Sequence, residues 1–163
     1  MLQIPQIRVE RLNSGASLLL GVLVLSFLVA TKSNAETIMS CGGTQGWGYS
    51  NMNAHPVWSR VDDSIPDGST TLVSMPQTQE VDILFQDAYG MNSARANGAE
   101  VALMDVKNGI ANVLAVYYSA SGVTIENYVF DANQKVMFVT TTRTLDPSST
   151  LQSKASIRWA NCQ

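Results

Sequence analysis

The fold is decided by residues 110–142, IANVLAVYYSASGVTIENYVFDANQKVMFVTTT. These residues predict three consecutive β-strands, Ile110–Tyr118, Val123–Phe130 and Lys135–Thr142, joined by short polar connections. In the first strand, residues 113–117 form an unbroken apolar run. Both faces of that strand are therefore apolar, and we expect a central strand covered on both sides.

Further strands are predicted on either side of this meander. Asn108-Gly109 favours a two-residue hairpin, which would place Ala99–Val106 beside Ile110–Tyr118. Residues 91–98 are the one place where a helical turn is expected. Apolar alternation predicts the remaining strands, which are a short one through Trp47 and Tyr49, then Val57–Val61, Ser69–Ser74, Glu80–Asp87 and Lys154–Ala160.

Alternation also predicts which side chains are buried. In Glu80–Asp87, Asp82 is expected on the polar face. Glu126 and Asn127 must point to opposite faces, so at least one of them needs a polar partner inside. In the last strand we expect one set to face the core and the other to face solvent, respectively Ala155, Ile157 and Trp159, and Lys154, Ser156 and Arg158.

The N-terminal 35 residues have the pattern of a cleavable signal peptide. Two arginines precede 13 apolar residues, Leu18–Ala30, and Ser33-Asn34-Ala35 supplies a cleavage site. A membrane anchor is the alternative, but 13 residues span only about 20 Å of a ~30 Å hydrocarbon core. A lipoprotein modified at Cys41 is a third possibility. We expect cleavage after Ala35, export to the periplasm or beyond, and no stable membrane span afterwards.

Residues 36–163 would then form a single antiparallel β domain of 163 − 35 = 128 residues. Its charge is 7 − 12 = −5, with the basic residues scattered, which argues against nucleic acid as a partner. Cys41 and Cys162 lie near its two ends, and in an exported chain they are expected to form one disulfide. The predicted fold class is all-β, a seven- to eight-stranded meander forming a small barrel or sandwich closed by that disulfide.

The glycine-rich stretch 42–49 carries Trp47 and Tyr49 at alternate positions. No strand precedes it, no helix follows it and no Lys ends it, so a phosphate-binding loop is not favoured. We expect a turn and a short strand, with both aromatics on one face and glycines where another backbone comes close. If a ligand is bound, Trp47, Tyr49, Trp58 and Tyr128 are the candidate walls of its site.

Acidic residues and the single histidine offer the other candidate sites. His55 stands in a loop-like stretch before Pro56, with no nucleophile motif beside it. Residues 62–68 contain three carboxylates but lack the ligand spacing of a calcium loop, so a turn is expected. Asp87 fits the first position of a type I turn that ends at Gly90. Cross-strand packing is expected for a group of aromatic residues, Tyr117, Tyr118, Tyr128, Phe130 and Phe138.

Two hypotheses about function follow, together with a structural role in the envelope. The first is an exported, non-catalytic domain that binds a protein or a small apolar ligand, without cofactor or metal. The second is a small enzyme that uses His55 as acid or base, with Asp63 or Asp87 orienting it.

Overall fold

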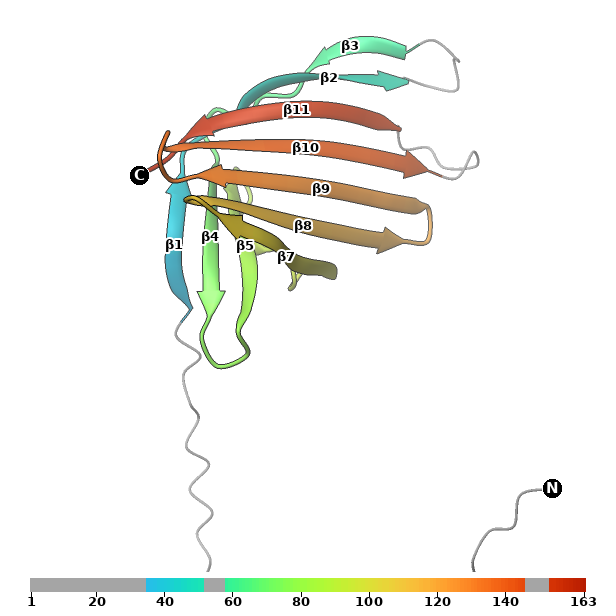
Figure 1. The fold of residues 1–163 in the computed structure, drawn as a ribbon. Helices are drawn as coiled ribbons and strands as arrows, with labels where there is room; N and C mark the ends of the chain where they lie inside the picture. Colours follow the sequence, from blue (N-terminus) through green and yellow to red (C-terminus); the bar gives the residue numbers. More distant parts are fainter. Residues whose placement is uncertain (1–34, 52–57, 146–152) are drawn as a thin grey trace, which may run out of the picture. The chain divides into compact units, whose positions relative to one another are not determined.

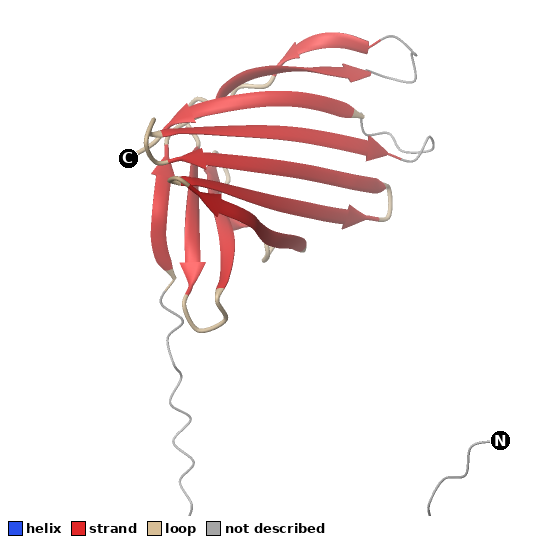
Figure 2. Cartoon of the chain, in the orientation of Figure 1, coloured by secondary structure: helices blue, strands red, loops and turns tan. Residues whose placement is uncertain are grey.

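Two antiparallel sheets and no helix are formed by residues 35–51, 58–145 and 153–163, the residues that the computed structural model describes (Figures 1 and 2). The smaller sheet has the order β1-β4-β5-β6, with β1 at Glu36–Cys41, β4 at Ser69–Met75, β5 at Glu80–Asp87 and β6 at Gly90–Ser93. The larger sheet has the order β3-β2-β11-β10-β9-β8-β7. Its strands are β2 (Gln45–Asn51), β3 (Trp58–Asp62), β7 (Ala99–Lys107), β8 (Ile110–Ser119), β9 (Gly122–Asp131), β10 (Val136–Leu145) and β11 (Lys154–Asn161).

The predicted meander is confirmed. Strands β8, β9 and β10 pair in sequence, each along ten residues without a bulge. The Asn108-Gly109 hairpin is confirmed as well, because Asn108 has φ 53° and Gly109 has φ 78°, the two positive values that a type I′ turn requires. It places β7 beside β8, as expected.

The core lies where one face of the larger sheet meets the smaller sheet. We call this the inner face of the larger sheet, and it carries the buried side chains Val113, Tyr128 and Val139. In Figure 1 strands β1, β4 and β5 run across the direction of β8–β11. The smaller sheet contributes Leu72 and Ile83 to the same apolar cluster. The opposite face is called the outer face below.

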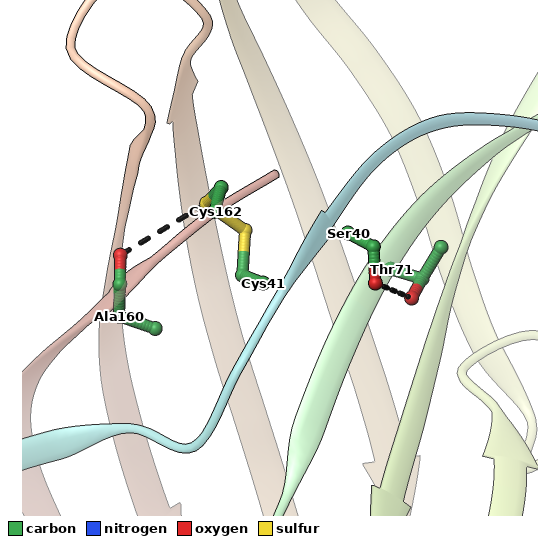
Figure 3. Close-up of a disulfide and its surroundings, with 5 residues drawn as sticks. All are labelled: Ser40, Cys41, Thr71, Ala160 and Cys162. Atoms are coloured by element: carbon green, nitrogen blue, oxygen red, sulfur yellow. Dashed lines mark hydrogen bonds between the residues drawn. A yellow bond between two sulfur atoms is a disulfide. The ribbon is translucent and has the colours of Figure 1, made fainter.

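The expected disulfide joins the two sheets (Figure 3). Cys41 ends β1 in the smaller sheet, and Cys162 follows β11 in the larger one. Backbone hydrogen bonds flank the bridge, from Gly42 N to Asn161 O at 3.0 Å and from Gln163 N to Ser40 O at 2.8 Å. The Ser40 and Thr71 hydroxyls, 3.0 Å apart, tie β1 to β4 beside it. The bridge therefore fixes the corner at which the sheets meet.

Several expectations about the fold are corrected. The described strands number eleven, and they form two sheets rather than the single closed barrel that was one of the two predicted forms. Residues 36–41, for which no strand was predicted, form β1. Strand β8 is not central but lies next to the edge strand β7. Val113 and Ala115 on its inner face are fully buried, whereas Leu114 and Val116 on its outer face are only half-buried.

The helical turn expected at residues 91–98 is present only in its second half: the segment begins with strand β6, and Asn97 N then donates to Ser93 O at 3.0 Å, the spacing of one helical turn, which ends at Gly98 with φ 84°. Asp82, expected on a solvent face, is buried beneath the turn that follows β6. It accepts hydrogen bonds from Ile83 N (2.8 Å), Arg95 N (3.2 Å) and the Ser93 hydroxyl. A buried carboxylate needs such donors. Asp82 thus organises the passage from β6 to β7.

The predicted orientation of β11 is also wrong. Trp159 and Ile157 are exposed on the outer face, while Arg158 and Lys154 point inward with side chains only 12% and 22% exposed. Alternation separates the two faces of a strand but does not say which one is buried. Here the inward charges have acidic partners, which makes their burial tolerable.

Candidate functional site

A cavity of about 390 Å³ lies between the inner face of the larger sheet and one end of the smaller sheet. Strands β8–β11 supply one wall, and β4, β5 and the connections around Thr44 and Ile65 supply the other. Aromatic and aliphatic side chains share the lining with charged ones. The lining side chains on which the argument below depends are Thr44, Phe85, Asp87, Tyr117, Thr124, Glu126, Tyr128, Val139, Arg143 and Arg158.

Along the strands of the larger sheet, the rows of paired residues on the inner face change from apolar near the disulfide to polar at the other end. Phe130, Met137 and Ala160 form an apolar row near the disulfide. The next row pairs Tyr128 with Val139 and Arg158, and the one after it pairs Glu126 with Thr141 and Ser156. The last row pairs Thr124 with Arg143 and Lys154. The first of these rows does not line the cavity, so a ligand would meet Tyr128 and Val139, beside Arg158, at one end and Arg143 at the other.

Glu126 is the centre of the polar network in this wall. Its Oε2 accepts a hydrogen bond from the Tyr128 hydroxyl at 2.5 Å, and its Oε1 accepts one from Thr141 Oγ1 at 3.3 Å and one from Arg158 Nη2 at 3.4 Å. Arg158 Nη2 also donates to Thr141 Oγ1 at 3.1 Å. This confirms that the Glu126-Asn127 pair places a polar group inside that needs partners. Both carboxylate oxygens of Glu126 are satisfied by the protein itself.

Asp63 extends the network through ion pairs. It pairs with Lys154, and its Oδ2 lies 3.6 Å from Arg158 Nε. Burial acts to raise the pKa of Asp63, but the hydrogen bond from Lys154 and the charge of Arg158 outweigh it, so this pKa lies below its ordinary value. Two acids and two bases, Asp63, Glu126, Lys154 and Arg158, thus compensate one another within the wall.

The two tyrosines of the cavity are held in their neutral form. Burial, followed by the nearby charge of Glu126, raises the pKa of Tyr117 and that of Tyr128 above the ordinary value of 10.0. Both hydroxyls therefore remain protonated at neutral pH, and each can donate a hydrogen bond. Tyr128, which lines the cavity, stacks on the core residue Phe130 with ring centroids 6.2 Å apart. The aromatic wall of the cavity is therefore continuous with the core.

Thr44 contributes a buried polar atom on the far wall. The residue is only 5% exposed, it lines the cavity, and its Oγ1 has no hydrogen-bond partner among the described residues. Its backbone pairs with Ile65, by N–O hydrogen bonds of 3.0 and 2.8 Å. A buried hydroxyl without a partner is costly to the fold, and a ligand in the cavity can supply one.

Of the four residues predicted to wall a ligand site, Trp47, Tyr49 and Trp58 share the outer face of β2 and β3, whereas Tyr128 lies on the opposite face. Trp47 and Tyr49 contact each other on the outer face, with ring centroids 6.2 Å apart. Trp58 is exposed on the edge strand β3. Tyr128 alone lines the cavity between the sheets. The register places Trp47 in one row with Asn127, so Tyr128 projects from the opposite face.

Glycine explains why β2 presents its aromatics outward. A Cβ at Gly46 would lie 2.7 Å from Arg158 Cγ, and one at Gly48 would lie 2.5 Å from Ser156 Cβ. Gly43 is similarly close to the backbone of Pro66. The expectation that these glycines mark close backbone approach is confirmed, because at Gly46 and Gly48 there is no room for a side chain between β2 and β11.

The outer face of the larger sheet carries exposed apolar side chains from neighbouring strands. Arg60 covers the Trp47 ring, with its Cζ 5.1 Å from the ring centroid. Tyr118 and Phe138, expected in one aromatic cluster with Tyr128, belong to the exposed set instead. Its main members on the outer face are Trp47, Tyr49, Tyr118, Ile125, Phe138, Ile157 and Trp159.

The residues named for the enzyme hypothesis are not brought into one constellation by the described part of the chain. His55 lies outside the described residues. Asp63 is engaged by Lys154 and Arg158, and Asp87 accepts a hydrogen bond from Tyr89 N at 2.8 Å, which confirms its role in a turn. Residues 62–68 form the expected turn, in which Asp62 accepts hydrogen bonds from Ser64.

Arg143 and Arg158 are site residues that the sequence interpretation missed. Alternation assigns Arg158 to the solvent face of its strand, and Arg143 lies just beyond Thr142, where the predicted strand ends although β10 continues to Leu145. A usable signal was the inward Glu126, which requires a cation nearby if it is buried. Within residues 35–51, 58–145 and 153–163, no group of three or more His, Cys, Asp or Glu side chains could hold a metal ion, and no helix is long and apolar enough to cross a membrane.

Comparison with known proteins assigns this chain to no group. No protein-family model, no curated protein and no solved structure matches it.

Proposed function

We propose that this chain is an exported, non-catalytic domain that binds a small ligand in the cavity between its two sheets. The observation that carries the proposal is the cavity itself, whose volume of about 390 Å³ falls within the range of about 300–1,000 Å³ usual for ligand sites. Export is supported by the Cys41–Cys162 disulfide, because such bonds persist in oxidising compartments.

The lining suits a ligand with an apolar body. Phe85, Tyr128 and Val139 offer apolar area from both sheets, so binding would remove apolar surface from water. Thr44 offers a hydroxyl that has no hydrogen-bond partner within residues 35–51, 58–145 and 153–163. A few placed polar groups within an apolar lining are what fixes the orientation of a small ligand.

The test is a titration with a neutral fluorescent probe small enough for the cavity, 1-aminonaphthalene. We expect saturable binding, with a blue shift of the emission as the probe leaves water. Thr124→Trp places a bulky ring in the cavity and should weaken binding about tenfold or more. Thr140→Trp, on the exposed outer face of the neighbouring strand, is the matched control and should bind as the wild type does. Absence of saturable binding, or equal loss in both variants, would refute the proposal.

A partner protein is a second candidate, favoured by the exposed outer-face residues. Contiguous exposed apolar side chains often mark interaction surfaces. Replacing Phe138 and Ile157 by serine should then abolish capture of one defined partner from an envelope extract and leave probe binding in the cavity unchanged. Retention of that partner by the double variant would rule out the outer face.

A further inference from the structure

We infer that the ligand is a medium-sized carboxylic acid, whose carboxylate is bound by Arg143 at the polar end of the cavity. This inference rests on the proposed function and names the ligand class of the same site. The sequence interpretation assigned no role to Arg143, which lies on β10 facing the cavity.

The charge balance of the cavity wall singles out Arg143. Glu126 is neutralised by Arg158, and Asp63 is neutralised by Lys154 and Arg158. Arg143, in contrast, has no hydrogen-bond or ion-pair partner among the described residues, although it is half-buried. A guanidinium group has five N–H donors in a planar fork that matches a carboxylate. A ligand carboxylate would provide the missing counter-charge.

The neighbours of Arg143 are compatible with a bound anion. Thr124 and Tyr117 lie in the same row of the inner face, and Lys154 flanks Arg143 on β11. The Thr124 hydroxyl is the donor beside Arg143, because the Tyr117 hydroxyl interacts with Glu126 and Tyr128. Hydroxyl donors next to a guanidinium group are suited to hold carboxylate oxygens.

A cationic ligand is disfavoured because the acidic groups of the lining already accept hydrogen bonds from the protein. Both oxygens of Glu126 already accept hydrogen bonds from the protein. Asp87, the other acid of the lining, stands at the end of β5 and holds the Tyr89 backbone N–H in its turn. Both carboxylates thus have hydrogen-bond partners in the protein, whereas the Arg143 guanidinium group has none among the described residues.

The dimensions set the size of the acid. Val139 and Arg143 are four residues apart on one strand, which corresponds to about 13 Å. At about 30 Å³ for each water-sized group, a cavity of about 390 Å³ holds roughly a dozen heavy atoms. Decanoate meets both limits, with its chain against Tyr128 and Val139 and its carboxylate at Arg143.

The experiment measures displacement of 1-aminonaphthalene by three ligands with the same chain, namely decanoate, decanol and decylammonium. We expect decanoate to bind about tenfold or more tightly than the other two, because only it forms a charge-assisted pair with Arg143. Arg143→Gln should remove this preference, and Arg143→Lys should retain part of it. Arg60→Gln, on the outer-face side, is the matched control and should retain all of it.

The outcomes separate this inference from the proposed function. If decanol displaces the probe as well as decanoate does, the cavity binds ligands but the acid preference is wrong. If decanoate is preferred equally by the wild type and Arg143→Gln, the assignment to Arg143 is wrong. If the probe itself does not bind, the proposed function and this inference are both refuted.

Discussion

At the residue scale, the inner face of the larger sheet holds charges in compensated sets. Asp63, Glu126, Lys154 and Arg158 are partly buried, and each has at least one partner of opposite charge within 4 Å. Removing one partner from such a set leaves another charge desolvated and unpaired, which costs more than the pair contributes. Arg143 stands outside the set, and its replacement should therefore affect ligand binding more than stability.

Asp63→Asn should lower the free energy of unfolding by about 1–3 kcal/mol at neutral pH, because Lys154 and Arg158 lose their acidic partner. The pKa of Asp63 is below its ordinary value of 3.8 in the folded chain. Its stabilising contribution is therefore complete above about pH 4 and is lost as the pH falls through the folded pKa. Urea unfolding at several pH values would measure this.

The difference in stability between the wild type and Asp63→Asn should accordingly shrink on acidification below pH 4. Asp105→Asn, at an exposed position of β7, is the control and should unfold like the wild type at neutral pH. A difference that stays constant from neutral pH to acid would show that the ion pairs of Asp63 do not stabilise the fold.

At the scale of elements, β2 illustrates how glycine directs a strand. Gly46 and Gly48 face inward and approach β11 so closely that no side chain fits. Trp47 and Tyr49 are consequently on the outer face, and Arg158 of β11, opposite Gly46, lines the cavity. The glycines thus decide which side chains of β11 can face the interior.

Gly48→Ala should destabilise the protein by about 1–3 kcal/mol, because the added Cβ would lie 2.5 Å from Ser156 Cβ and 2.6 Å from Ala155 O. Gly42→Ala is the matched control, since its nearest neighbour would be Asn161 O at 4.0 Å. Chemical denaturation measures both variants. Equal stability of the two alanine variants would contradict the close approach of β2 and β11.

Local signals predicted most elements well. The Asn108-Gly109 turn, the meander of β8–β10 and the bounds of β5 follow from turn chemistry and from period-two alternation, which act within a few residues. The assignment of faces failed in β11, where Arg158 is inside and Trp159 outside. That choice depends on Asp63 and Glu126, which are remote in sequence, and on the glycines of β2.

At the scale of the whole molecule, two sheets share one core and one covalent link. The core draws on β1, β4 and β5 as well as β7–β11, and the disulfide joins the sheets beside it. Composition and cysteine placement predicted an all-β domain with this bridge. The sequence could not decide between one closed barrel and two sheets, nor predict the cavity between the sheets, because both depend on which strands exchange hydrogen bonds over long separations.

Replacing Cys41 and Cys162 by alanine should lower the free energy of unfolding by about 2–5 kcal/mol, because the bridge closes a loop with a sequence separation of 121 residues. The loss should appear as a lower denaturation midpoint in urea. The wild type under reducing conditions should behave like the double variant. Unchanged stability in both would mean that the packing of the two sheets alone fixes their corner.

The bridge also makes the polypeptide between its cysteines a closed ring. Cleaving one peptide bond in an exposed turn, such as Ser119–Gly122, would open that ring without releasing a fragment, since the two pieces remain joined through sulfur. A single protease cut outside the reducing cytosol would thus give two pieces that have new ends at the cut but stay joined by the disulfide, in place of two separate peptides. The core would still be assembled from one covalent molecule.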